Sequence, residues 1–423
     1  MTVRWNMGEK AKRTDTILFS VLMATAGVLI LAAVISQPNR MLLEGFLRIQ
    51  GDETGLITDS IVTGGQGGAL LNAGIILALS TLLIRRLKMP FTGMSVACLF
   101  MMAGFALMGK NLVNTLPILA GGWIYSLYRR EPFSKYLYVS FFGTCLSPMV
   151  SFVMNNARYG LRGLTMVLCG VAIGFFLPPV SAYTVRIHQG YNLYNVGFAA
   201  GFIGLGMASI LKGFGVEFAD TSSWSQNNGI LLDVLIWGLL AALFVLGAVL
   251  GCRSWRQYRP ILRHSGRAVA DFTALDGPGP TFVNMALTGM LGLLYLRWMR
   301  VDLNGPMLCC IFSLVGFAAF GKHPRNVIPV ALGAVASSRL MGNIPIDTPT
   351  VLVATYLCTG LAPIAGQFGV FWGFLAGFMH MTIVQHTAFL HGGMNLYNNG
   401  FAAGLTCVLM LPIIQALRPE PEE

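Results

Sequence analysis

One segment of the chain occurs twice. Residues 188–201 read HQGYNLYNVGFAAG and residues 391–404 read HGGMNLYNNGFAAG, so the two copies agree at 11 of 14 positions. A shared apolar composition would not produce this agreement in a stretch rich in Asn, Tyr and Gly. A duplication of this kind is typical of an internal repeat, and it predicts that the chain folds as two related units.

The two halves also match outside this motif. At an offset of 212 residues Asn72 corresponds to Asn284, and several Gly, Lys and Pro positions coincide as well. We therefore predict a first repeat over residues 15–215 and a second repeat over residues 227–417.

The composition places both units in a membrane. Of the 423 residues, 55% are hydrophobic and only 11% are charged, which leaves too little polar surface to cover a soluble globule. The apolar blocks have the length of a helix that crosses a hydrocarbon core of roughly 30 Å. The sequence thus predicts an all-α polytopic integral membrane protein with about 14 hydrophobic segments, seven in each repeat, some of them broken or re-entrant.

The basic residues predict how the segments cross. If the amino terminus is cytoplasmic and every block crosses, the cytoplasmic loops hold 19 of the 28 Lys and Arg residues, including a basic loop over 252–279. This is the positive-inside bias of membrane proteins. An odd number of crossings per repeat then inverts the second repeat, and we expect both termini on the cytoplasmic side of the cell inner membrane. If residues 112–128 and 326–340 re-enter instead, the repeats are parallel.

Each repeat has a polar interruption between two apolar blocks. Residues 105–117 read FALMGKNLVNTLP and residues 317–329 read FAAFGKHPRNVIP. In each, Gly ends one helix, a Lys follows, and an Asn opens the next helix, whose positive dipole end favours an anion. Lys110 and Lys322 would add positive charge. The alternative is a short turn whose lysine extends to the lipid headgroups.

The duplicated motif supplies further candidates. Asn192 and Asn195 are three positions apart and would share one face of a helical turn, as would Asn395 and Asn398. In one interpretation these amides and the neighbouring His and Tyr side chains line a solute pathway, because polar groups in membrane spans are costly and commonly mark function. In the other they only join neighbouring helices by hydrogen bonds, while the GxxxG that follows allows close helix packing. The complete predicted substrate-binding set is Lys110, Asn114, His188, Asn192, Tyr194, Asn195, Lys322, Asn326, His391, Asn395, Tyr397 and Asn398.

The sequence contains no signature of a soluble catalytic site, such as a P-loop, GxSxG, HExxH or dinucleotide fingerprint. The eight cysteines show no CxxC spacing, and His380, His386 and His391 share no helical face. We therefore expect no catalytic residue, metal or cofactor. The basic residues lie in short clusters between apolar blocks, so nucleic acid is not an expected partner. Asp233, alone in an apolar run, is either a proton-coupling carboxylate or a structural hydrogen-bonding group.

The duplicated HxGxNLYNxGFAAG, together with GGALLNAGI and the GKN and GKH interruptions, resembles an uncharacterised prokaryotic multipass membrane-protein family, a domain of unknown function. The resemblance covers roughly residues 15–415 and implies no established activity. A fainter similarity is to urea transporters, which also duplicate a helical unit with inverted topology. Their characteristic threonine and Pro-Phe pattern is not reproduced in order, so this second similarity concerns architecture only.

We expect a secondary carrier of a small polar or anionic metabolite, with its site at the repeat interface near the bilayer midplane. Inverted-repeat carriers bind there, because broken helices leave backbone groups free to contact the solute. The alternatives are a passive channel for a small neutral, urea-like solute, and a non-transporting membrane enzyme or scaffold. The solute and membrane lipid are the expected partners, and a homo-oligomer is left open.

Overall fold

The computed structural model describes residues 8–52, 54–218, 222–341 and 345–417, and every regular element in these ranges is helical. Arg4 and Arg418, which contribute to the predicted charge bias, lie outside the described residues.

The helices of the first predicted repeat are α1 to α9. Their bounds are α1 Glu9–Ser36, α2 Asn39–Gly51, α3 Ser60–Arg86, α4 Gly93–Ala106, α5 Leu112–Tyr128, α6 Leu137–Gly143, α7 Ser147–Asn156, α8 Arg162–His188 and α9 Asn195–Gly213. Short 3-10 turns occur at Phe133–Lys135, Thr144–Leu146 and Tyr159–Leu161.

The helices of the second predicted repeat follow in the same order. Their bounds are α10 Leu231–Val249, α11 Trp255–Tyr258, α12 Phe272–Leu275, α13 Pro278–Trp298, α14 Gly305–Phe317, α15 Pro324–Met341, α16 Pro349–Leu357, α17 Ala362–Phe368, α18 Val370–Val384 and α19 Asn398–Ala416. Short 3-10 turns occur at Ile261–Arg263, Cys358–Leu361 and Ala388–His391.

Backbone irregularities recur at equivalent places in the two sets of helices. Gly65 (φ 69°, ψ 172°) interrupts α3 after its first turn, and Gly277 (φ 87°, ψ 171°) separates α12 from α13. Gly109 and Gly321 adopt φ values of 105° and 111° in the turns that follow α4 and α14. Because only glycine adopts these conformations readily, the shared glycines explain why the same breaks appear twice.

The helices are long and apolar enough to embed the protein in a membrane. Among the described residues, nine segments meet the length and hydropathy of a membrane span, namely α1, α3, α6–α7, α8, α9, α10, α13, α16–α17 and α19. Helices α4, α14 and α18 are apolar but shorter. Large apolar side chains such as Leu31, Phe176 and Val245 are exposed on the outer surface, which suits contact with lipid. The chain is thus an all-helical polytopic membrane protein, as predicted.

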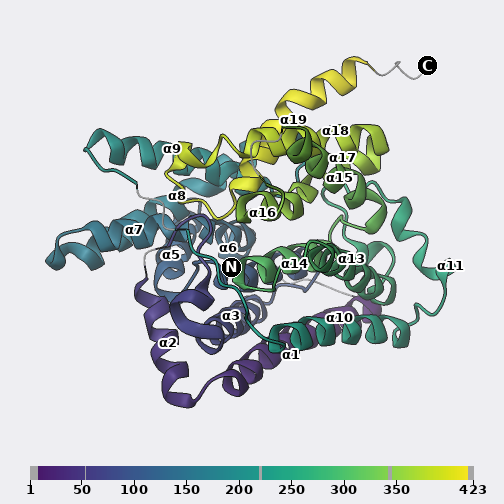
Figure 1. The fold of residues 1–423 in the computed structure, drawn as a ribbon, viewed down its shortest axis with the longest axis horizontal. Helices are drawn as coiled ribbons and strands as arrows, with labels where there is room; N and C mark the ends of the chain where they lie inside the picture. The colour runs from purple at the N-terminus through teal and green to yellow at the C-terminus, as the bar shows by residue number, and fades with distance from the viewer. Residues whose placement is uncertain (1–7, 53, 219–221, 342–344, 418–423) are drawn as a thin grey trace.

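The helices run between two ends of the molecule. The α11 segment and the last turns of α19 lie at one end of the long axis, and α2 and the end of α7 lie at the other (Figure 1). We call these ends the α11 side and the α2 side. At the α2 side Thr54 donates to the carbonyl oxygen of Gly109, just after α4, at 3.1 Å. At the α11 side His323, just after α14, hydrogen-bonds the carbonyl oxygen of His264 at 3.0 Å.

Helices α4 and α14 form the centre of the molecule and run antiparallel. All residues of α14 and all but Met94 of α4 are buried. A Cβ atom added to Gly104 would lie 3.1 Å from the Cα atom of Cys309, and one added to Gly316 would lie 2.7 Å from the Cβ atom of Phe100. The small residues therefore allow the two helices to approach closely.

Each central helix begins at a carboxylate of the other repeat. Asp271 accepts a hydrogen bond from the backbone N–H of Gly93 at 3.0 Å, and Asp59 accepts one from that of Gly305 at 3.2 Å. A negative charge at a helix amino terminus is stabilising. Burial raises the pKa of Asp59, and hydrogen bonds from Ser225 and Gly305 act in the opposite direction. The repeats are therefore joined at both ends of their shared centre.

Candidate functional site

The two copies of the duplicated motif meet where the repeats contact each other. The rings of Tyr194 and Tyr397 lie 4.8 Å apart between their centroids. Immediately after them α9 and α19 cross, and a Cβ atom on Gly197 would lie 3.0 Å from the Cα atom of Gly400. The GxxxG glycines thus allow the close packing that the sequence suggested, and they bring the tyrosines together.

In each motif the histidine contacts an asparagine of the same motif. The distance from His188 Nε2 to Asn195 Oδ1 is 2.8 Å, and that from His391 Nε2 to Asn398 Oδ1 is 3.0 Å. Each of these Asn oxygens also accepts from a threonine hydroxyl at 2.8 Å. Helices α9 and α19 begin at Asn195 and Asn398, so the prediction that Asn192 and Asn395 share a helical face with them is wrong. These side chains stabilise the turn itself.

Asn192 and Asn395 each stabilise the turn of their own motif, but they differ in the number of hydrogen bonds that they form. Their Oδ1 atoms accept from the backbone N–H groups of Tyr194 and Tyr397 at 2.9 and 3.0 Å. Asn192 Nδ2 also donates to the carbonyl oxygen of Gly400 in the other repeat at 3.0 Å. Asn395 Nδ2 is buried and has no hydrogen-bond partner among the described residues.

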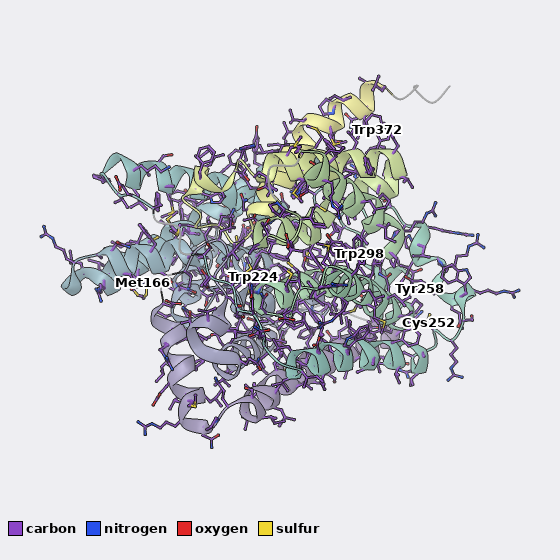
Figure 2. All side chains as sticks on the ribbon, viewed as in Figure 1. Met166, Trp224, Cys252, Tyr258, Trp298 and Trp372 are labelled. Carbon is purple, nitrogen blue, oxygen red and sulfur yellow. The ribbon has the colours of Figure 1, made fainter. Side chains whose placement is uncertain are left out.

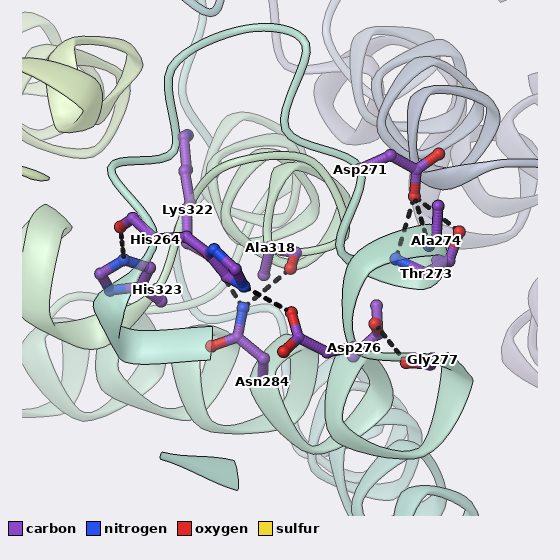
Figure 3. A network of polar contacts seen from close by, with 11 residues as sticks. His264, Asp271, Thr273, Ala274, Asp276, Gly277, Asn284, Ala318, Lys322 and His323 are labelled. Carbon is purple, nitrogen blue, oxygen red and sulfur yellow. Dashed lines mark hydrogen bonds and ion pairs between the residues drawn. The ribbon is translucent and has the colours of Figure 1, made fainter. Parts of the chain in front are cut away.

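The two lysines lie inside the protein. The exposed fractions of Lys110 and Lys322 are 1% and 0%, so the alternative that they extend to the lipid headgroups is wrong. Asn72 donates to the carbonyl oxygen of Lys110 at 2.8 Å, and Asn284 donates to that of Lys322 at 2.7 Å (Figure 3). These asparagines were absent from the predicted site, although each is an amide in an apolar helix that recurs in both repeats.

The helices after the lysines begin earlier than the sequence suggested. Asn111, not Asn114, is the N-cap of α5, because its Oδ1 accepts from the backbone N–H of Asn114 at 2.8 Å. Before α15 the backbone N–H of His323 donates to Asn326 Oδ1 at 2.9 Å. The prediction that Asn114 and Asn326 open their helices is therefore wrong. Their Nδ2 groups donate back to the glycine carbonyl of the preceding turn, which is a structural role.

The basic loop closes over the Lys322 turn from the α11 side. His264 hydrogen-bonds Asp276 at 2.8 Å and contacts His323 through its carbonyl oxygen (Figure 3). Tyr258, beside Cys252 at α11 in Figure 2, donates from its hydroxyl to Asn284 Oδ1 at 3.0 Å. The loop is therefore part of the packed structure.

Lys322 has oxygen partners for its amine. Its Nζ atom donates to the hydroxyl of Tyr194 and lies 3.4 Å from Ser313 Oγ. The Tyr194 hydroxyl and Ser313 Oγ are themselves 2.8 Å apart. These three side chains form a closed polar cluster.

Lys110 lacks such partners. Within the described part of the chain, its Nζ atom contacts Met102 Sδ, at 3.3 Å, and the ring of Phe105, whose centroid lies at 5.2 Å. Thioether sulfur is a weak hydrogen-bond acceptor. The amine is therefore buried with little to neutralise it.

Tyr397 lies on the Lys110 side of the tyrosine pair. Its ring centroid is 5.1 Å from that of Phe105, and its buried hydroxyl has no hydrogen-bond partner within the described ranges. The Lys110 amine lies over the same Phe105 ring, 5.2 Å from its centroid. Lys110 and Tyr397 thus share one environment.

A cavity of about 180 Å³ leads from the α11 side to the tyrosine pair. Val269, which is 83% exposed, lines it next to Ala268 in the basic loop. Most of its lining side chains are apolar; the polar ones are Tyr138, Ser181, His188, Asn192, Tyr194, Asn195 and Tyr397. Neither lysine is among its lining residues. The cavity therefore joins both motifs, with the lysines behind the tyrosines.

A second hollow, of about 440 Å³, lies on the α2 side. It is lined by Leu56 and Ile57, the repeat counterparts of Ala268 and Val269. Its lining extends to Met394 and includes neither motif tyrosine. The two hollows thus occupy related positions on opposite sides, and only the α11-side cavity reaches the pair.

One other candidate from the sequence, Asp233, lies outside this arrangement. Asp233, at the start of α10, pairs with Arg297 at the end of α13, which favours the structural interpretation. Within the described part of the chain, no group of three or more His, Cys, Asp or Glu side chains is placed to hold a metal ion.

Comparison with known proteins finds one family. The model of a family described as a protein of unknown function (DUF1576) matches residues 38–213 and 252–416, in two stretches that fall within the two predicted repeats. No curated protein and no solved structure matches the chain. The predicted resemblance to an uncharacterised family is confirmed, and the similarity to urea transporters stays a prediction about architecture.

Proposed function

The chain belongs to the DUF1576 family of unknown function, and from its structure we propose that it is a secondary carrier of a small polar or anionic solute. The observation that carries the proposal is the 180 Å³ cavity, which ends at the tyrosine pair where the two motifs meet. Carriers built from inverted repeats bind their solutes at the repeat interface, between broken helices.

The paired hollows support a carrier over a passive channel. A carrier exposes its site to one side at a time, and related hollows on opposite sides suit such alternation. Here the α11-side cavity reaches Tyr194 and Tyr397, whereas the α2-side hollow extends to Met394. A channel would require both hollows to reach the same point.

The chemistry of the interior supports a solute with a polar or negative group. Lys110 and Lys322 are buried, and neither forms an ion pair with a described Asp or Glu. A buried positive charge without a partner is costly, so an anionic group on the solute would stabilise it.

We further propose that the protein resides in the cell inner membrane with its α11 side in the cytoplasm. The basic loop 252–279, with five arginines, lies on this side, and α1 begins there while α19 ends there. Basic loops remain on the cytoplasmic side during insertion. Both termini are therefore assigned to the cytoplasm.

Uptake into proteoliposomes tests the carrier proposal. The purified full chain is reconstituted, and the uptake of labelled small carboxylates and neutral amides is measured with and without a proton gradient. Val185→Trp places a large ring at the wall of the α11-side cavity, whereas Val245→Trp alters an exposed position on α10.

We expect saturable uptake that falls about ten-fold in the Val185→Trp protein, because the ring occupies the path to the tyrosines, and that persists in the Val245→Trp protein. Equal uptake by both variants would contradict the proposed pathway. Flux that rises linearly with solute concentration would favour a channel.

A further inference from the structure

We infer that the two lysines have different roles: Lys110, together with Tyr397, binds a carboxylate or similar oxyanion of the solute, whereas Lys322 is held by Tyr194 within the protein. The inference rests on the proposed carrier function and assigns its solute a chemical class. It starts from the different hydrogen-bond partners of Lys110 and Lys322, which occupy equivalent positions in the two repeats.

The polar groups around Lys322 satisfy one another without a ligand; we call Lys322, Tyr194 and Ser313 the Lys322 half. Its amine contacts the Tyr194 hydroxyl and Ser313 Oγ, and these two oxygens hydrogen-bond each other. Ser313 corresponds in the first repeat to Met101, which has no hydroxyl. Because Met101 has no hydroxyl, Lys110 and Tyr397 cannot form the same cluster.

The equivalent residues Lys110, Tyr397 and Asn395, which we call the Lys110 half, contain hydrogen-bond donors without strong acceptors. Lys110 offers three N–H donors, and among the described residues its one hydrogen-bond acceptor is the weakly accepting Met102 Sδ. Tyr397 OH and Asn395 Nδ2 are buried and unpartnered among the described residues, whereas their counterparts Tyr194 OH and Asn192 Nδ2 are both bonded.

Buried donors that lack acceptors are destabilising, and in native proteins they call for an explanation. A ligand that supplies several acceptor oxygens would satisfy the Lys110 amine and the Tyr397 hydroxyl. A carboxylate has this chemistry, and its hydrogen bonds to an ammonium and a phenol are charge-assisted and strong. A neutral solute would leave the lysine charge without compensation.

Tyr397 connects this half to the access route. It lines the 180 Å³ cavity, and its ring packs against Phe105, on which the Lys110 amine also lies. Because the lysine is not in the cavity wall, a solute reaches it only when the Tyr397 ring shifts. Tyr397 is therefore at the end of the cavity, next to the Phe105 ring that the Lys110 amine contacts.

Binding to the detergent-purified full chain tests the assignment. The probes are acetate, lactate, succinate and inorganic phosphate, with acetamide as the neutral match of acetate, and binding is followed by titration calorimetry. The variants are Lys110→Met and Tyr397→Phe, compared with Lys322→Met and Tyr194→Phe. Lys135→Met, which removes an exposed lysine, controls for the change in net charge.

We expect at least one of the anionic probes to bind more tightly than acetamide. Its dissociation constant should rise about ten-fold or more in Lys110→Met and Tyr397→Phe. Lys322→Met and Tyr194→Phe should chiefly lower the melting temperature, with a smaller change in affinity. Tyr397→Phe removes a hydroxyl that has no hydrogen-bond partner among the described residues, so this variant should remain folded. If phosphate binds more tightly than the carboxylates, the oxyanion group of the solute is a phosphate.

The inference is overturned if acetamide binds as tightly as acetate, if no anionic probe binds, or if the two lysine variants lose affinity equally. Transport is read separately. Uptake that persists in Lys110→Met would remove the oxyanion site but leave the carrier. If the anion binds in a Lys110-dependent way but the protein transports no solute, the oxyanion site stands and the carrier proposal is wrong.

Discussion

At the scale of single residues, the most informative contrast is between the two motif tyrosines. Tyr194 OH bonds Ser313 and Lys322, whereas Tyr397 OH has no bonding partner in the described structure. The same substitution should therefore have opposite effects at the two positions.

We expect Tyr194→Phe to lower the free energy of unfolding by about 1–2 kcal/mol, because it leaves the buried Lys322 amine and Ser313 hydroxyl with fewer partners. Tyr397→Phe should leave stability unchanged or raise it by up to about 1 kcal/mol, because it removes an unsatisfied hydroxyl. Unfolding of the purified protein in mixed detergent measures both. A loss in Tyr397→Phe as large as that in Tyr194→Phe would mean that this hydroxyl is satisfied.

The sequence indicated which residue types matter but not which of them find partners. It placed Lys110 and Lys322 as equals, since both follow Gly in matching interruptions. The difference between them arises from Ser313 in the preceding helix α14, whose counterpart is Met101, and from Tyr194, which reaches Lys322 from the first repeat through tertiary packing. The sequence contains the Ser313–Met101 difference, but local patterns do not show that Tyr194 lies beside Lys322.

At the scale of helices, close packing at the repeat contact depends on small residues, which the GxxxG pattern correctly indicated. The N-cap before α5 was misplaced by three residues for a specific reason. Asn111 and Asn114 form a reciprocal pair, and each alone could open the helix. Only the backbone conformation distinguishes them.

Two glycines of α9 provide a matched test of this packing. A Cβ atom on Gly197 would meet the Tyr397 ring at 2.9 Å, whereas one on Gly206 would meet nothing within 4 Å. We expect Gly197→Val to destabilise the protein by about 3 kcal/mol or more, or to prevent folding, while Gly206→Val costs about 1 kcal/mol or less. Yield and melting temperature of the purified variants measure the difference. Similar behaviour of the two variants would contradict the tight crossing of α9 and α19.

The carboxylates at the starts of the central helices offer a second test. Asp271→Ala should lower the free energy of unfolding by about 1–2 kcal/mol, because Gly93 and the first turn of α12 lose their acceptor. Asp271→Asn keeps an acceptor oxygen and should cost less. The same order is expected for Asp59, and thermal unfolding provides the measurement. Equal losses in the Ala and Asn variants would mean that the charge, not the hydrogen bond, is what stabilises the cap.

At the scale of the whole molecule, the composition and the apolar blocks were sufficient to predict a polytopic helical membrane protein. The cavity was beyond sequence reasoning, because it depends on how side chains from several helices meet. The assignment of the α2 and α11 sides to opposite faces of the membrane stays a prediction.

Chemical labelling in intact cells tests that assignment. The eight native cysteines are buried, so a membrane-impermeant maleimide should give little background. A cysteine introduced at Leu43 in α2 should react from outside, whereas one at Trp255 in α11 should react only after the membrane is opened; both positions are exposed. Labelling of both from the same side would exclude the inverted topology.

The reciprocal capping of α4 and α14 also constrains the order of synthesis. When the ribosome has finished the first half, Gly93 at the start of α4 still awaits Asp271, which is translated much later. The early half must therefore persist in the bilayer as an unfinished intermediate, shielded by lipid or by the insertion machinery. Severed halves produced together should reassemble, while either half made by itself should be degraded.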